Sequence, residues 1–154
     1  MDAAPQTYNF SLRGARARLQ PNRPPRNLKF QPERPGGANI VTRIEPARIW
    51  IGAAAFDHSV LVPWSGAVQR WEASRFEALR ATHFEQMLAL EPELVIFGSG
   101  SRLRFPSPAL TRALIERRIG VETMDTAAAC RTYNVLAGEG RRVLAALLLE
   151  TDSA

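Results

Sequence analysis

The chain has 154 residues, 45% of them hydrophobic and 23% charged, which is typical of one globular domain with a full core. One cysteine and two histidines exclude a disulfide framework and a zinc-ligand set, so we expect no metal and no cofactor. The longest aliphatic run, residues 143–149, is too short to cross a bilayer, and there is no signal-peptide pattern, so we expect a cytoplasmic protein.

The positive charge lies at the N-terminus. Residues 1–38 carry seven basic and two acidic side chains (7 − 2 = +5), whereas residues 39–154 carry 13 of each. The first segment also holds six of the eleven prolines and few large apolar residues, so we predict a disordered Arg/Pro-rich arm over residues 1–27. Such an arm can contact phosphates, but it lacks regularly spaced aromatics for base stacking, so no specific nucleic-acid partner is expected.

A single α/β domain is predicted over residues 28–150, followed by a flexible tail over residues 151–154. Its first half is rich in β-strand patterns. After these strands the apolar period lengthens, which predicts one or two helical segments that end before Pro92. The predicted elements of this half are strands at 39–45, 48–52, 58–64 and 67–71, and helical segments within 72–92.

The second half alternates between strands and helices, which implies a parallel pair of strands joined by a crossover helix. The first helix is well punctuated: Ser107 is placed to cap it, Pro108 lies in its first turn, and Gly120 is placed to end it. The last two helices are joined at Gly138 and Gly140. The predicted order is a buried strand (93–100), a helix (107–120), a strand (121–124), a helix within 124–143, and a helix (141–150).

Polar residues and glycines follow two of these strands, where open α/β sheets hold ligands. The segment GSGSRL imitates a dinucleotide fingerprint, but Leu103 stands where the third glycine belongs, which argues against a Rossmann-type NAD site. Two interpretations stay open: an anion or ligand pocket, or a tight turn whose arginines are solvated or paired with Asp125. The candidate pocket consists of Gly98, Gly100, Arg102, Arg104, Asp125, Thr126 and Asn134.

Cys130, the single cysteine of the chain, is the candidate nucleophile in the segment MDTAAACRTYNVLAGEGRRV (124–143). On a helical wheel it shares a narrow sector with Thr126, Tyr133 and Ala137. No cationic residue lies beside it on that face to lower the pKa of its thiol. We therefore predict a buried structural thiol and assign no catalytic residue.

Several motifs in register resemble the domain-of-unknown-function family four-nine-eight. They lie in PELVIFGSGSRLRFPSPAL and IGVETMDTAAACRTYNVLAGEGRRV, and the match extends over residues 28–150. The resemblance implies a three-layer fold around a mixed, mostly parallel five-stranded sheet, with a β-rich N-terminal half and helices in the C-terminal half. It implies no established catalytic activity, and the family includes a mitochondrial complex I assembly factor. The motif positions are Gly98, Gly100, Asp125, Thr126, Thr132, Asn134 and the Glu139–Arg141 turn.

Two functional hypotheses follow. The first is a non-catalytic interaction or assembly-type domain, linked by the resemblance to respiratory complex I biogenesis in a bacterium. It would act through a protein partner and contact a membrane complex peripherally. The second is a small-molecule or anion-binding protein, an enzyme included, that uses the Gly98–Gly100 turn and the Asp125–Thr126 helix start.

Overall fold

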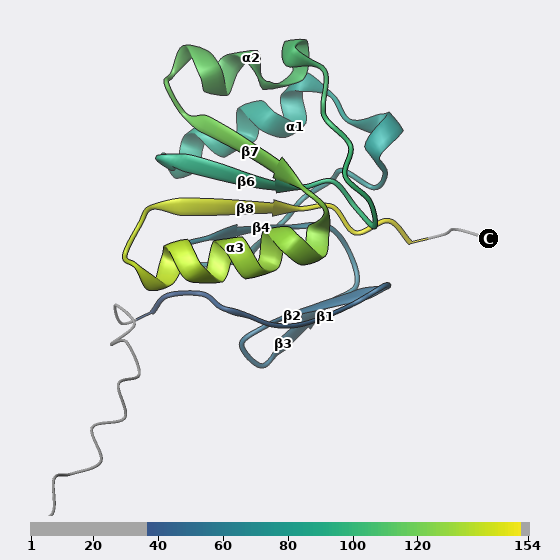
Figure 1. Ribbon diagram of the computed structural model, residues 1–154, viewed down its shortest axis with the longest axis vertical. Coiled ribbons are helices and arrows are strands. Elements are labelled where there is room, and N and C mark those ends of the chain that lie inside the picture. Colours follow the sequence, from purple (N-terminus) through teal and green to yellow (C-terminus); the bar gives the residue numbers. More distant parts are fainter. Residues whose placement is uncertain (1–36, 152–154) are drawn as a thin grey trace, which may run out of the picture. The chain divides into compact units, whose positions relative to one another are not determined.

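The structure, a computed structural model, describes residues 37–151. The predicted arm (residues 1–27) lies outside this range, as do residues 152–154 of the predicted tail (151–154), so both stay predictions. The main element is a five-stranded sheet of order β5-β4-β8-β6-β7 (Figure 1). Its strands are β4 (Val60–Pro63), β5 (Gln69–Arg70), β6 (Leu94–Gly98), β7 (Gly120–Met124) and β8 (Val143–Leu147).

Strand β8 occupies the centre of the sheet, which corrects the prediction of a helix over residues 141–150. It pairs parallel to β6 and antiparallel to β4, in register from Leu94↔Val143 and from Val60↔Leu147. All five of its residues are buried. An apolar strand buried on both faces shows no alternation, and its alanines and leucines are good helix formers, so the sequence pattern favoured the wrong element.

The sheet is mixed, as predicted, but it is not mostly parallel. The β6–β7 and β6–β8 pairs are parallel, whereas the β4–β8 and β4–β5 pairs are antiparallel. The crossover from β6 through α2 (Pro108–Glu116) to β7 gives the predicted parallel pair. Two parallel and two antiparallel pairings make the sheet evenly mixed.

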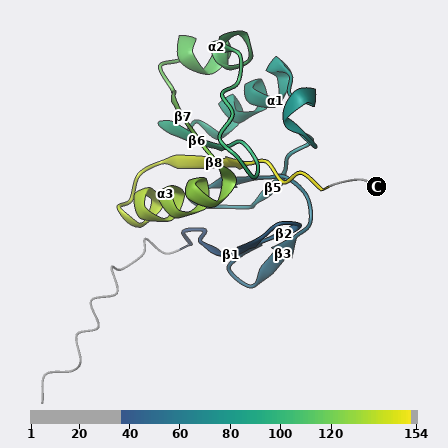
Figure 2. The ribbon, with the colours of Figure 1, turned by 45° about the vertical axis from the view of Figure 1, so that its right-hand side comes forward.

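Successive side chains of β8 enter two separate cores, one on each face of the sheet. Val143, Ala145 and Leu147 belong to the core that includes helix α3 (Thr126–Gly138). Leu144 and Ala146 belong to the core on the other face, which includes residues from helices α1 (Ala81–Glu85) and α2. Figures 1 and 2 show α3 on one side of the sheet and α1 and α2 on the other.

Helix α3 does not cover its face of the sheet alone. A three-stranded antiparallel sheet of order β1-β2-β3 lies on the same side, and Val41, Ile49 and Ile51 bury their side chains in the α3 core (Figure 2). This covering layer is therefore composite, with one helix and one small sheet, and not the helical layer of a simple three-layer fold. The strands are β1 (Val41–Glu45), β2 (Arg48–Ile51) and β3 (Ala54–Phe56), the last of which was not predicted.

The helical segments begin and end at residues other than those predicted. The predicted segment over residues 72–92 breaks into α1 and two short 3-10 turns, η1 (Phe76–Ala78) and η2 (Gln86–Leu90). Pro108 opens α2 as predicted, but the Ser107 side chain makes no capping hydrogen bond. Gly120 begins β7 and does not end α2; the left-handed residue after this helix is Arg118, with φ of 59°.

Among residues 37–151, no helix has the length and apolar composition needed to cross a membrane.

Candidate functional site

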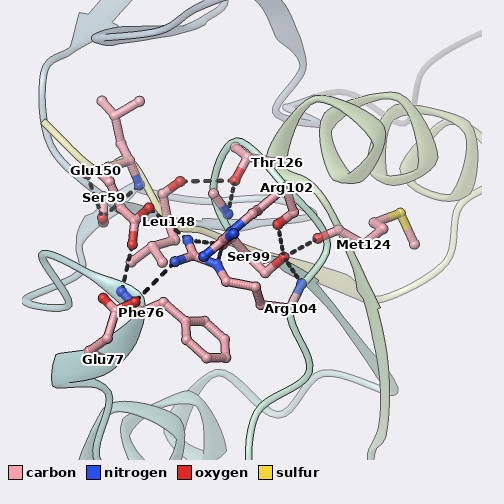
Figure 3. Close-up of polar contacts among 12 residues, drawn as sticks. Ser59, Phe76, Glu77, Ser99, Arg102, Arg104, Met124, Thr126, Leu148 and Glu150 are labelled. Atoms are coloured by element: carbon pink, nitrogen blue, oxygen red, sulfur yellow. Dashed lines mark hydrogen bonds and ion pairs between the residues drawn. The ribbon is translucent and has the colours of Figure 1, made fainter.

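The candidate site forms where β6 and β8 end and helix α3 begins. The hydroxyl of Thr126, the first residue of α3, accepts from the Gly100 N–H (2.9 Å) and donates to the Leu148 carbonyl (2.8 Å). The Thr126 N–H donates in turn to the Gly100 carbonyl (2.8 Å). One buried threonine thus fastens the helix start to the segments that follow both strands (Figure 3).

The two glycines of the turn meet different steric demands. A Cβ on Gly98 would lie 2.9 Å from the Thr126 Cα, so glycine is needed for the close approach of α3 to β6. Gly100 has φ of +99°, and a Cβ there would meet the guanidinium of Arg104 and the carboxylate of Glu150. The G-x-G segment therefore serves helix and side-chain packing in this fold.

Asp125 caps helix α3. Its carboxylate accepts from the Ala128 N–H at 2.8 Å, as the helix-cap interpretation expects. The alternative pairing of Asp125 with an arginine of the loop is not observed, because Arg104 pairs elsewhere and Arg102 is exposed and forms no ion pair among the described residues.

Arg104 is directed inward, and its side chain is only 14% exposed. Its guanidinium donates to Glu150 Oε2 and to the Ser99 carbonyl, both at 2.6 Å, and lies 4.6 Å from the Phe76 ring centre. The other oxygen of Glu150 accepts from the Phe76 N–H at 2.7 Å, and Glu77 is a second, longer ion-pair partner of Arg104 at 3.4 Å. The cluster in Figure 3 joins the loop after β6 to η1 and to the segment after β8.

Asn134 does not belong to this site. It lies on α3, where its side-chain amide binds both backbone groups of Val41 in β1. The predicted pocket residues therefore separate into three groups. Gly98, Gly100, Asp125 and Thr126 lie together, and Arg104 lies beside them within an ion-pair cluster. Arg102 is exposed on the same loop, and Asn134 contacts β1.

A cavity of about 420 Å³ lies at the start of α3. Three carboxylates line it, those of Glu45, Asp125 and Glu150. Glu45 pairs with Arg43 and Glu150 pairs with Arg104, so Asp125 at the positive end of the helix is the one of the three without an ion-pair partner among residues 37–151. The cavity suits a neutral or cationic group better than an anion. Its other lining residues are Ile44, Pro46, Gly100, Ser101, Thr126, Ala127, Leu148 and Leu149.

Cys130 lies in the core between α3 and the sheet and is 4% exposed. Burial raises the pKa of its thiol to about 12, and burial likewise raises the pKa of the neighbouring Tyr133 above its ordinary value. The Tyr133 hydroxyl donates to the Pro63 carbonyl (2.8 Å), a backbone group of β4. A thiol with this pKa is protonated at neutral pH and is a poor nucleophile.

Two residues central to the site were missed in the sequence. Glu150 was assigned to the end of a helix, so its position after β8, beside Arg104, was not foreseen. Ser99 was not singled out between the two glycines, although its hydroxyl accepts from the Arg104 N–H and donates to the Arg102 carbonyl.

Among the described residues, no group of three or more His, Cys, Asp or Glu is arranged to hold a metal ion.

Known proteins resemble the chain in sequence. The Bos taurus protein named NADH dehydrogenase (ubiquinone) 1 alpha subcomplex assembly factor 3 is 36% identical over 99 residues, which are 63% of this chain and 53% of that protein. The Homo sapiens protein of the same name is 36% identical over 90 residues, 57% of this chain and 48% of that protein. The chain spans about half the length of these curated relatives.

Solved structures resemble the chain in fold as well. The crystal structure of a Bordetella parapertussis protein has a TM-score of 0.70 at 36% identity, covering 74% of this chain and 98% of that one. The solution structure of a Bordetella pertussis protein described as a Mth938-like domain has a TM-score of 0.67 at 32% identity, covering 75% and 88%. Residues 41–148, more than half of the chain, match the family described as "Protein of unknown function (DUF498/DUF598)". The resemblance expected from the sequence motifs is thereby confirmed, and the chain belongs to the DUF498/DUF598 family.

Proposed function

We propose that this chain is a non-catalytic interaction domain of the assembly-factor type, which acts through protein partners in the biogenesis of a respiratory NADH dehydrogenase. The link to that complex comes from the relatives named as its assembly factors. The chain matches about half of the length of those proteins, and the family to which it belongs covers residues 41–148.

One observation supports a non-catalytic role: the polar side chains at the site already form hydrogen bonds or ion pairs with other groups of the protein. Asp125 caps a helix, the Thr126 hydroxyl is used as both donor and acceptor, and Arg104 is bound by carboxylates and a carbonyl. General acid–base or nucleophilic catalysis requires a group that faces substrate with its hydrogen-bonding capacity available. These side chains instead hold strands and helices together.

Affinity capture tests this proposal. The tagged full-length chain, expressed from its own promoter, is cross-linked and purified from its own cells, and bound proteins are identified by mass spectrometry. We expect reproducible recovery of NADH dehydrogenase subunits, and less assembled complex on native gels when the gene is deleted. Normal assembly in the deletion strain, together with capture that matches an untagged control, would contradict the proposal.

The cavity at the start of α3 favours one second candidate, small-molecule binding. Its three carboxylates and its apolar residues, among them Ile44 and Leu149, fit a compound with a cationic head and an apolar body. On this candidate, primary amines raise the melting temperature saturably, because a ligand that binds only the native state stabilises it. Glu45→Gln should reduce the gain, and sulfate or phosphate should give none. If amines change the melting temperature no more than sodium chloride does, this candidate function is wrong.

A further inference from the structure

His83 ties helix α1 to the segment of chain that precedes it. Its ring nitrogen Nδ1 accepts from the Arg80 backbone N–H at 2.9 Å, and its backbone carbonyl accepts from the Trp71 indole N–H at 3.1 Å. The imidazole also lies edge to face with the Trp71 ring, with 6.3 Å between the ring centres. One residue of α1 therefore holds both ends of the segment 71–80.

The contact with Arg80 requires a neutral imidazole. A ring nitrogen that accepts a hydrogen bond carries no proton, so the neutral ring has its proton on Nε2. In the protonated ring both nitrogens are donors, and Nδ1–H would face the N–H of Arg80. At this third position of a helix, glutamine or glutamate usually accepts from the backbone N–H that precedes the helix. A histidine in this position makes the contact dependent on pH.

The surroundings of His83 favour its neutral form. Partial burial lowers the pKa of His83 below its ordinary value, the positive charge of Arg80 lowers it further, and the negative charge of Glu72 opposes them. Glu72 is itself paired with Arg70 at 3.3 Å. The turn η2, which packs against α1, carries no charged side chain. The other charged side chains of α1 and of α2, which also packs against it, are exposed; they are Glu85, Arg112 and Glu116.

The loop 72–80 is held to the rest of the domain at a few points. Ala73 and Leu79 bury their side chains in the core on the α1 and α2 side of the sheet, and none of the residues between them is buried. In the middle of the loop, the Phe76 N–H donates to Glu150, and the Phe76 ring contacts Arg104. A segment with so few buried side chains can loosen while the core stays folded.

We propose that His83 is a pH-sensitive latch on the loop 72–80, closed while its imidazole is neutral and loosened when the ring takes up a proton. Loosening frees the Arg80 N–H and, through the loop, weakens the contact of Phe76 with the Arg104–Glu150 pair. The proton acts as a ligand that binds the loosened form more tightly, so acidification shifts the population towards that form. The latch is independent of the proposed assembly function, since it needs no partner protein.

The direction of the pH dependence follows from the lowered pKa of His83. An unfolded chain protonates its histidines near their ordinary pKa of about 6.5, whereas folded His83 takes up its proton only at lower pH. Below about pH 6.5 the unfolded state therefore binds more protons than the folded state. The stabilisation by His83 is fully present above this pH and is lost as pH falls through the pKa of the folded state.

Denaturation of the full-length chain by urea, between about pH 7.5 and about pH 5, tests the latch. The wild-type unfolding free energy should fall over this range. His83→Gln keeps the hydrogen-bond acceptor but gains no proton, so it should match the wild type at the higher pH and lose less stability on acidification. His58→Gln is the matched control, because His58 is the other histidine of the chain and pairs with Asp57 instead of a helix start. It should keep the wild-type pH dependence.

Nuclear magnetic resonance reports the latch directly. Long-range proton–nitrogen spectra should show His83 protonated at Nε2 at neutral pH, and its titration midpoint should lie below the midpoint in the urea-unfolded chain. His83→Ala should speed hydrogen exchange of the Arg80 amide about fivefold, the effect of losing one ordinary hydrogen bond. On acidification the Phe76 amide should lose protection, after correction for intrinsic rates, in the wild type but not in His83→Gln.

Three results would overturn the latch. One is a loss of stability on acidification that is as large in His83→Gln as in the wild type. Another is a His83 ring that carries its proton on Nδ1 at neutral pH, because such a ring cannot accept from Arg80. The third is a Phe76 amide whose protection is the same at both pH values, which would mean that His83 does not hold the loop. None of these results bears on the capture of respiratory subunits, so the assembly function is tested separately.

Discussion

Asn134 acts as the strand partner of Val41. The Asn134 side-chain oxygen accepts from the Val41 N–H at 2.9 Å, and its NH₂ donates to the Val41 carbonyl at 2.8 Å, across 93 residues of sequence. A side-chain amide carries the same donor and acceptor as a peptide group, so it satisfies both backbone groups of the first residue of β1. This pair fastens the three-stranded sheet to helix α3.

Replacement of Asn134 should therefore detach the small sheet from the helix. In Asn134→Ala both backbone groups of Val41 lose their partner in a partly buried position, which we expect to cost about 2 kcal/mol of unfolding free energy. Urea denaturation measures the cost, and hydrogen exchange should show the Val41 amide exchanging faster than amides of β8.

Asn134→Asp separates the two hydrogen bonds. A carboxylate still accepts from the Val41 N–H but faces the Val41 carbonyl without a proton to donate. Its deficit relative to the wild type should shrink at acid pH, where the carboxyl group becomes protonated. Val135→Ala, at the exposed neighbouring position, should change stability by no more than about 0.5 kcal/mol. An Asn134→Ala variant as stable as this control would refute the strand-partner role.

The Arg104–Glu150 pair should contribute to stability beyond an ordinary surface ion pair. Both side chains are largely buried, at 14% and 24% exposure, and Glu150 also accepts from the Phe76 N–H. Glu150→Gln keeps the size of the side chain but leaves Arg104 short of charge compensation. We expect a loss of about 2 kcal/mol in unfolding free energy, since breaking one side of a buried pair strands the other charge.

A double-mutant cycle isolates this contact. Arg104→Met and Glu150→Gln are measured singly and together by urea denaturation, and we expect a coupling of about 1 kcal/mol or more. Arg102→Met is the matched control in the same loop, because Arg102 is exposed and should be neutral. If the losses in unfolding free energy of the two single variants simply add up in the double variant, the Arg104–Glu150 contact makes no contribution of its own to stability.

Cys130 should make the protein less stable at alkaline pH. Burial raises the pKa of its thiol from 9.0 to about 12, so above about pH 9 the unfolded chain releases a proton that the folded chain retains. The unfolded state then binds fewer protons, and unfolding free energy falls as pH rises towards 12. Denaturation between pH 8 and about pH 11 should show a shallower decline in Cys130→Ala than in the wild type.

The same burial controls the reactivity of Cys130. The native protein should react slowly with iodoacetamide at neutral pH and quickly once denatured, and Cys130→Ser should cost about 1–2 kcal/mol because a buried hydroxyl lacks a partner. Rapid, stoichiometric labelling of the native protein would instead indicate an activated thiol.

The elements with local signals were predictable from the sequence. The alternation in β1 and β2, the strand–helix–strand unit from β6 to β7, and the Asp125 cap all depend on residues close together in the chain. Strand β8 was not predictable in this way, because its character is set by neighbours on both sides, β4 and β6, that are distant in sequence. With all five residues buried, β8 has no polar alternation to distinguish it from a helix.

The error at β8 also determined which site residues were missed. A helix over residues 141–150 would direct Glu150 away from the loop after β6, whereas the parallel pairing of β6 and β8 brings it to Arg104. Asn134 was assigned to the pocket because a motif cannot show which way a helix faces. Its role appears only when β1 lies against α3.

Two glycines of helix α3 and its neighbouring strand give a matched pair of substitutions. Gly98→Ala should destabilise the protein by about 1–3 kcal/mol, because the new methyl group would lie 2.9 Å from the Thr126 backbone and 3.1 Å from the Ala129 side chain, forcing α3 away from β6. Gly138→Ala, at the last residue of α3, meets nothing within 4 Å and has no left-handed backbone. Alanine is the better helix former by about 1 kcal/mol, so this change should be neutral or stabilising.

Thermal and urea unfolding of both variants measure the difference in stability. Hydrogen exchange of the Gly100 amide, which donates to Thr126, should accelerate only in Gly98→Ala. If Gly98→Ala were as stable as Gly138→Ala, the close contact between α3 and β6 would not explain why residue 98 is a glycine.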